Sequence, residues 1–179
     1  IVALLGLECY DDRIIAPIAR SLGEEKLSAA IRLCNDIITE KDPEVLLEQI
    51  MSISLKITGA QRAFLFQIDR KSGIPVLKAS KNIAGDCLPE FSRSIVDEVI
   101  STEHSIIISN AGEETSFRGQ KSVLLGELKS VMCIPVKHSN HLIGVYYLDN
   151  PLSTGVFSEN EAKLLESLLL RAQDSLKAI

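Results

Sequence analysis

Aromatic residues and basic segments are both scarce in this chain. It has no tryptophan, and aromatic residues make up only 4% of its 179 residues, so little is available for a large stacking pocket that would hold a purine. The 19 Lys and Arg residues are outnumbered by 24 Asp and Glu residues, which gives a net charge of −5, and no segment concentrates the basic ones. Nucleic acid is therefore not an expected partner.

Long apolar runs and paired cysteines are also missing. The longest apolar stretch, residues 1–7, is far shorter than the roughly 18–20 residues that a membrane span needs. No basic leader precedes it, so neither a secretory signal nor a membrane partner is expected. The four cysteines, at positions 9, 34, 87 and 133, form no C-x-x-C pair. This spacing favours reduced thiols and a cytoplasmic location, with disulfides as the weaker alternative.

Motifs for a cofactor, a metal or a nucleophile are missing as well. The sequence contains neither a Gly-rich phosphate loop nor a recognisable Ser-His nucleophile pattern. His104 ends a predicted helix, while His138 and His141 flank a predicted turn with no third ligand nearby. We therefore expect solvated imidazoles, no metal and no cofactor.

Helix and strand signals cover residues 22–179, which we interpret as one domain, whereas residues 1–21 form a helical flank or linker. Because the chain begins with Ile, we expect a module cut from a longer polypeptide. An N-capping Asp followed by Pro predicts a helix start at Asp42, and Gly59 predicts its end. Ser158 and Glu161 form a capping box, which predicts a long helix to Ile179.

The remaining elements follow from apolar periodicity. Spacings of three and four predict helices, and alternation or short β-branched runs predict strands. Pro135 inside a strand predicts an edge or a bulge. The order of helices and strands does not alternate regularly, which favours an α+β domain around an antiparallel sheet. The predicted helices are 27–38, 42–58, 92–100 and 158–179, and the predicted strands are 62–69, 74–80, 105–109, 131–138 and 142–150.

Several segments together resemble a GAF domain. They are TGAQRAFLFQID at 58–69, SIVDEVI at 94–100, LKSVMCIPVKHSNHLIGVYYLDN at 128–150, and Phe157 followed by Glu161 at the start of a leucine-rich helix. The resemblance implies a PAS-related α+β fold with five to six antiparallel strands and the terminal helices packed on one face. It also implies a regulatory sensor module of a sensor kinase, cyclase, phosphodiesterase or transcription activator, with an output domain elsewhere in the parent chain.

In such a fold, a small-molecule pocket would lie between one sheet face, the helix near residues 86–103 and the loop 110–128. A concave site of this kind is the usual place for a ligand. The alternative is that the same side chains only fill the core. The candidate lining residues are Phe66, Phe91, Ile95, Ile107, Ser109, Phe117, Leu124 and Met132.

More specific ligand and enzyme assignments lack their residues. Cyclic-nucleotide-binding GAF domains carry an Asn-Lys pair and a Phe-x-x-x-Asp-Glu, whereas this chain has Asn150-Pro151 and Phe157-x-x-x-Glu161-Ala162. No Cys-His pair is available for a bilin. Free-methionine sulfoxide reductases use cysteines in a loop that contains none here. Cys133 is expected to pack as a small hydrophobe, which leaves Cys87 as a candidate redox thiol and a redox-active enzyme as the third hypothesis.

The terminal helices predict a homodimer. Their apolar stripes are wider than the roughly 100° that one core-facing stripe needs, so a second copy is expected to cover the excess. A ligand would then change the packing of these helices and control the output domain. The alternatives are that the domain's own sheet absorbs both stripes, or that the domain dimerises without any ligand. The interface candidates are Leu27, Ile31, Cys34, Ile38, Leu165, Leu168, Ala172 and Ile179.

Overall fold

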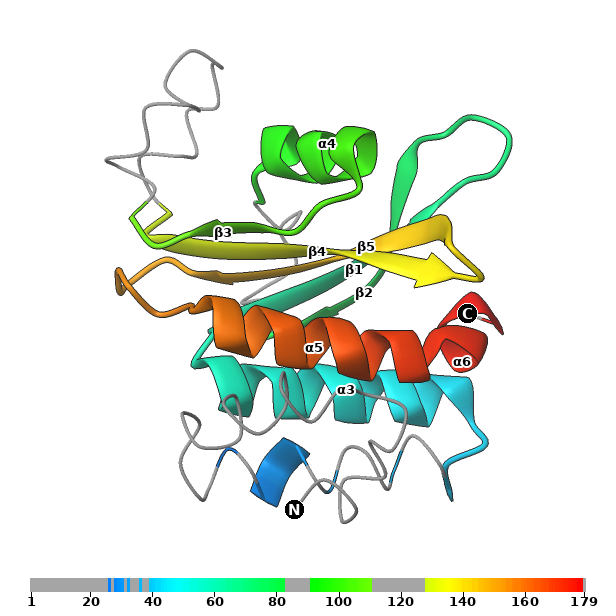
Figure 1. Cartoon of the computed structure of the whole chain (residues 1–179), viewed down its shortest axis with the longest axis horizontal. Coiled ribbons are helices and arrows are strands. Elements are labelled where there is room, and N and C mark those ends of the chain that lie inside the picture. Colours follow the sequence, from blue (N-terminus) through cyan, green and yellow to red (C-terminus); the bar gives the residue numbers. More distant parts are fainter. Residues whose placement is uncertain are drawn as a thin grey trace.

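The fold is a five-stranded antiparallel sheet with helices on both faces. The structure, a computed structural model, describes residues 39–82, 91–110 and 128–178, together with positions 26, 28–30, 32 and 36 (Figure 1). Within these residues the strands have the spatial order β2-β1-β5-β4-β3, and every pair is antiparallel. The α+β fold expected from the sequence is therefore confirmed. The strands are β1 Arg62–Ile68, β2 Pro75–Lys81, β3 Ile106–Ile108, β4 Ser130–His138 and β5 His141–Asn150.

Helix α3, Pro43–Thr58, begins and ends where its local sequence dictates. The Asp42 carboxylate accepts hydrogen bonds from the N–H groups of Glu44 and Val45, which have no partner inside the helix. Gly59 ends the helix in the left-handed conformation, with φ of 74°. Both predicted boundaries are confirmed, and they place one apolar side of α3 on the sheet.

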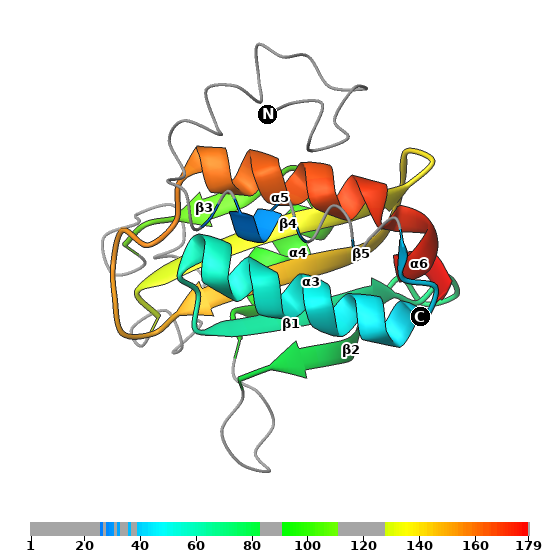
Figure 2. The same cartoon turned by 90° about the horizontal axis from the view of Figure 1, so that it is seen from below.

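The C-terminal segment was predicted to be one long helix, but the structure shows two helices. The capping box of Ser158 and Glu161 is present and opens α5, Glu159–Arg171. The backbone then leaves helical geometry at Ala172, where ψ is 3°, and α6, Gln173–Ala178, follows in a new direction. Figure 2 shows this change of direction. Helix α6 contacts α3 and β4, and its buried Leu176 belongs to the same core as they do. None of the described helices is long and apolar enough to cross a membrane.

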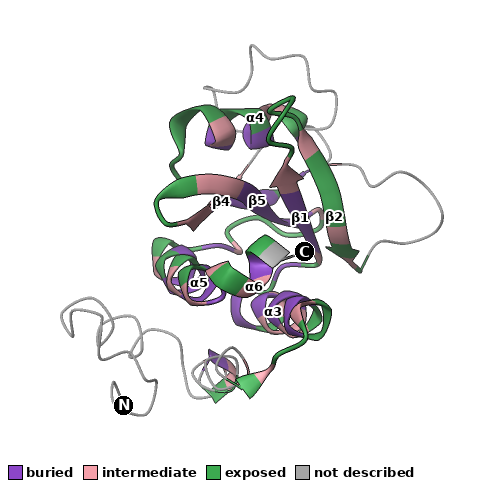
Figure 3. Ribbon diagram, turned by 90° about the vertical axis from the view of Figure 1, so that its right-hand side faces the viewer, coloured by how far each residue is buried: buried purple, intermediate pink, exposed green. Residues whose placement is uncertain are grey.

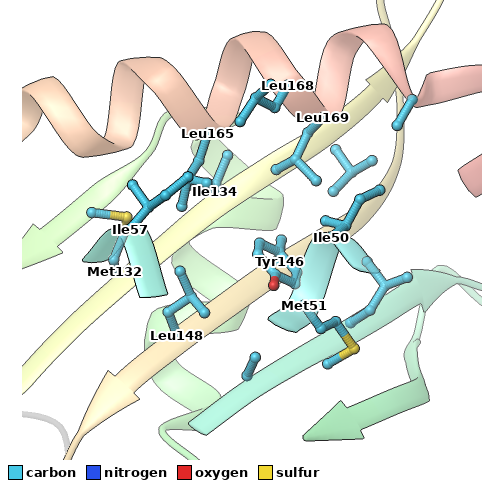
Figure 4. Packing of buried hydrophobic residues seen from close by; sticks show 14 of the residues in the cluster. Ile50, Met51, Ile57, Met132, Ile134, Tyr146, Leu148, Leu165, Leu168 and Leu169 are labelled. Carbon is cyan, nitrogen blue, oxygen red and sulfur yellow. The ribbon is translucent and has the colours of Figure 1, made fainter. Parts of the chain in front are cut away.

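Side chains of the inner strands point alternately into two separate cores, because successive residues of a strand face opposite sides. The first, the helix-side core, is covered by α3, α5 and α6 (Figures 3 and 4). The second, the α4-side core, is covered by α4, Arg93–Thr102. In the helix-side core the sheet contributes Ala63, Leu65, Met132, Ile134, Val136, Tyr146 and Leu148. In the α4-side core it contributes Phe64, Phe66, Ile108, Val131, Cys133, Val145 and Tyr147.

Pro135 lies where β4 has no outer neighbour among the described residues. The short strand β3 pairs only with the segment from Val131 to Cys133. The β4–β5 register also shifts between Val136 and Lys137. A proline cannot donate to a ladder, so an edge segment next to a bulge is a site that tolerates it. The prediction for Pro135 is confirmed.

Gly144 allows strands β1 and β5 to approach each other. A Cβ atom at this position would lie 2.4 Å from the carbonyl oxygen of Phe66. We expect Gly144→Ala to lower the free energy of unfolding by about 3 kcal/mol, because backbone has to move in a packed core. Gly73→Ala is the comparison: its Cβ would meet open space, but φ is +70°, so the expected cost is about 1 kcal/mol. Equal losses in urea denaturation would contradict the steric explanation.

Candidate functional site

The α4-side core contains an aromatic cluster that joins β1, β5 and the segment before α4. The ring centroids of Phe66 and Phe91 are 4.6 Å apart, and those of Phe64 and Tyr147 are 5.6 Å apart in an edge-on arrangement. Phe91 is only partly buried, whereas the other three rings are buried. Helix α4 packs Ile95 on this cluster. The result is an apolar, aromatic surface with one partly open member.

A buried ion pair lies at one end of this surface. Arg62 Nε and Nη2 donate to the two carboxylate oxygens of Asp149, each at 2.7 Å. The Asp149 side chain is fully buried, and the Arg62 side chain is 21% exposed. The guanidinium carbon of Arg62 also lies 5.9 Å from the centre of the Phe64 ring. Burial raises the pKa of Asp149, and the hydrogen bonds from Arg62 oppose this rise.

The hydroxyl of Tyr147 ties the sheet to the start of α4. It accepts a hydrogen bond from the N–H of Ser92, the N-cap of α4, at 3.3 Å. Burial raises the pKa of Tyr147 well above its ordinary value, and the negative charge of Asp149 raises it further. The phenol therefore stays protonated. A movement of α4 would be felt by β5 at this contact.

The residues that align with the cyclic-nucleotide motif make hydrogen bonds within the fold. The Asn150 amide donates to the Gly59 carbonyl at 3.1 Å and accepts from the N–H groups of Leu152 and Ser153. One Glu161 oxygen accepts from the N–H and hydroxyl of Ser158. The other pairs with Lys26 of the N-terminal segment. Glu161 therefore pairs with a lysine far away in the sequence, whereas the position after Asn150, a lysine in the motif, is Pro151 here.

Five of the eight predicted pocket residues pack in the two cores, on opposite faces of the sheet. Phe66, Phe91 and Ile95 meet on the α4 side. Met132 and Ile107 pack on the helix side, so their assignment to the same pocket is wrong. They are register partners, and each is one residue away from side chains that face α4. Phe117 and Leu124 lie outside the described residues.

Ser109 is exposed, and its carbonyl accepts from the Gly155 N–H at 2.7 Å and from the Ser130 hydroxyl at 3.1 Å. It therefore fastens the end of β3 to the β5–α5 connection. Phe64 and Tyr147 were not among the predicted pocket residues. For Phe64, the alternation with Phe66 on one strand face was a signal in the sequence.

The predicted dimer residues of α5, together with Ala172 just after it, pack inside the single chain. Leu165, Leu168 and Ala172 are each 1% exposed and belong to the helix-side core. Their assignment to a homodimer interface is therefore wrong, because α3 and the sheet already cover them. Ala30, from the N-terminal segment, is buried in the same core. Leu27, Ile31, Cys34, Ile38 and Ile179 lie outside the described residues.

Cys133 is the buried cysteine of the described residues. It is fully enclosed in the α4-side core, and burial raises its pKa well above the ordinary value. A thiol in this state is a poor nucleophile, because the thiolate is the reactive form. Cys87 lies outside the described residues. Among the residues described, no group of three His, Cys, Asp or Glu side chains could hold a metal ion.

Comparison with known proteins finds similarity to GAF domains both in sequence and in structure. The GAF domain model matches residues 42–174. The GAF domain of a phosphoenolpyruvate-protein phosphotransferase from Acinetobacter has a TM-score of 0.68 at 17% identity, covering 86% of this chain and 93% of that one. A free methionine-R-sulfoxide reductase from Neisseria meningitidis, in complex with its substrate, has a TM-score of 0.68 at 14% identity, covering 88% and 93%.

A curated relative is similar over a shorter segment. Hybrid signal transduction histidine kinase G of Dictyostelium discoideum is 29% identical over 72 residues, which is 40% of this chain and 2% of the kinase. The chain thus spans a very small part of that relative's length.

The two neighbouring tyrosines allow a matched test of the α4 contact. Tyr147→Phe leaves the Ser92 N–H without its partner, so we expect the free energy of unfolding to fall by about 1 kcal/mol. The Tyr146 hydroxyl is buried on the other face beside the Ser54 hydroxyl, without a hydrogen bond of good geometry among the described residues. Tyr146→Phe should therefore change stability by less than about 0.5 kcal/mol, or increase it. Urea denaturation distinguishes them, and a larger loss for Tyr146→Phe would refute the assignment.

Arg62→Met tests the buried pair and its pH dependence. The substitution leaves the Asp149 carboxylate buried without its partner, and the expected loss at neutral pH is about 3 kcal/mol. Without Arg62, burial alone raises the pKa of Asp149. A raised pKa in the folded state contributes stability that is present at low pH and lost as the pH rises through that pKa.

The loss relative to wild type should therefore be smaller at about pH 5 than at about pH 8. Lys163→Met is the control, since Lys163 and Glu159 form an exposed pair at 3.6 Å that is worth less than about 0.5 kcal/mol. A pH-independent loss for Arg62→Met would show that the Asp149 charge is not its cause.

Proposed function

The chain belongs to the GAF domain family, and from this premise we propose that it is the regulatory sensor module of a larger signalling protein, with a small-molecule site on the α4 side of the sheet. GAF domains are commonly signalling modules, and the similarity to a segment of a hybrid histidine kinase supports this role. An attached output domain in the parent chain is part of the proposal. The singly spaced cysteines favour a reducing, cytoplasmic setting.

The observation that carries the proposal is the difference between the two sheet faces. The helix side is filled by α3, α5 and α6, which leaves buried aliphatic side chains packed against one another. The α4 side is covered, among the described elements, by one ten-residue helix, and it combines aromatic rings with the Arg62–Asp149 pair. Apolar and aromatic walls with a few fixed polar groups are typical of small-molecule sites.

Transmission from this site would pass through β5. The strand supplies Tyr147 to the α4 side and Tyr146 to the helix side. It ends at Asn150, whose side chain holds the connection to α5. A ligand that binds two positions of α4 unequally would shift β5 and then α5. This path lies within one chain.

The other hypotheses from the sequence have less support. A dimerisation module built on the predicted α5 residues has less support, since Leu165 and Leu168 are buried inside the domain. A second copy would have to meet the chain elsewhere. A reductase like the one from Neisseria meningitidis would need an accessible thiolate, and the cysteine within the described residues, Cys133, is enclosed. We therefore propose regulation by a ligand rather than catalysis.

A thermal-shift screen against nucleotides, amino acids and small aromatic acids tests this function. A ligand at about one hundred times its Kd should stabilise the fold by about 2.7 kcal/mol, which is a rise in Tm of about 5–10 °C for a domain of this size. Phe91→Ala should abolish the rise. Ile53→Ala is the matched control, because Ile53 is equally half-buried but packs on the helix side. If the rise in Tm survived Phe91→Ala and were lost in Ile53→Ala, the ligand would bind on the helix side of the sheet and the proposed site would be refuted.

A further inference from the structure

A groove of about 370 Å³ runs along the outer edge of β4, away from the α4-side site. It lies outside the α4-side core and the ligand site proposed above, and it reaches the helix-side core only at Leu169. Its walls come from the turn between α4 and β3, from β4 and from α5. The lining residues are Glu103, His104, Ser105, Pro135, Lys137, Glu166, Leu169 and Leu170.

The groove occupies the position of a missing strand. Helix α4 lies on one face of the sheet and α5 on the other (Figures 1 and 3). A groove lined by residues next to both helices must therefore pass the edge of β4. Strand β3 stops at Ile106, opposite Cys133. From Ile134 to His138, the outer side of β4 has no strand partner within the described part of the chain.

The floor of the groove is apolar. Leu170 is 45% exposed, although most leucines of α5 are buried. Pro135 and the edge of Leu169 continue this surface. Burying such side chains against a partner is favourable in proportion to the area removed from water. An apolar side chain of an added segment would therefore gain free energy here.

The rim of the groove carries an excess of negative charge. The carboxylate of Glu103 is paired with the Lys137 ammonium at 2.9 Å, so these two charges compensate each other. Glu166 is exposed, and its carboxylate accepts a hydrogen bond from the neutral hydroxyl of Ser105. A basic side chain of a partner would complement Glu166 in charge, whereas an acidic one would be repelled.

We propose that this groove binds an extended peptide segment of another protein, which adds to β4 as a strand and places a basic side chain at Glu166 and an apolar one on Leu170. Strand addition supplies main-chain hydrogen bonds along the β4 edge, except at Pro135, which has no N–H to donate, and the alternate side chains supply specificity. A second copy of this chain, joined groove to groove, fits less well. The basic side chain that its β4 edge would offer to Glu166 is Lys137, which is already paired with Glu103. The proposal does not depend on the ligand site of the α4 side.

The test is a titration of the whole 179-residue chain, followed by amide NMR, with a terminally blocked peptide of sequence Val-Lys-Val-Leu-Val, whose Lys and Leu lie on one face of an extended strand. The matched probes are Val-Glu-Val-Leu-Val, the basic peptide with alternate amides N-methylated, and n-butylamine. We expect saturable changes in amide chemical shift that are confined to β4, the α4–β3 turn and α5. The acidic peptide and the N-methylated peptide should each bind at least about tenfold more weakly, which corresponds to one lost charge contact or strand ladder.

Glu166→Lys should remove the preference for the basic peptide, and Leu170→Glu should weaken both peptides. Glu159→Lys is the control, because it reverses the charge of an equally exposed residue of α5 that does not line the groove. Equal binding of the two peptides, equal binding after N-methylation, or full competition by n-butylamine would each overturn the strand-addition proposal. So would concentration-dependent self-association that Glu166→Lys abolishes, since the occupant would then be a second copy.

Discussion

The central constraint of this domain is that its inner strands are buried on both faces. Strands β1, β5 and β4 send alternate side chains into two cores that share no residue. A shift of one residue in register would exchange the contents of these cores, which differ in size and chemistry. The adjacent Tyr146 and Tyr147 show the consequence most directly, since one hydroxyl lies among aliphatic side chains (Figure 4) and the other holds α4.

Polar groups within this doubly buried sheet serve geometry more than net stability. A buried ion pair loses much of its Coulomb energy to desolvation. The Arg62–Asp149 pair nevertheless gives β1 and β5 a single relative position, because both carboxylate oxygens are bound by one planar group. Asn150 and Ser130 continue this network into the β5–α5 connection. The aromatic surface beside α4 is thereby held in place at one end.

Local signals predicted the boundaries of elements, and the errors concern tertiary packing. Asp42, Gly59 and the Ser158–Glu161 box depend on a few adjacent residues, so the sequence contains the whole cause. The break at Ala172 has no such signal, because it follows from seating Leu176 in the core. Which sheet face the Met132 side chain points to depends on the register of β4 with β5. The burial of Leu165 and Leu168 depends on α3 and the sheet, which an apolar stripe alone cannot reveal.

Glu161 illustrates how one side chain can join two ends of a domain. Its two oxygens hold the first turn of α5 and, through Lys26, the segment that precedes α3. A force applied to that segment would reach α5 through one rigid carboxylate, without passing through the sheet. The first turn of α5 is therefore fastened at two points by a single side chain, one to its own N-cap and one to a residue far away along the chain.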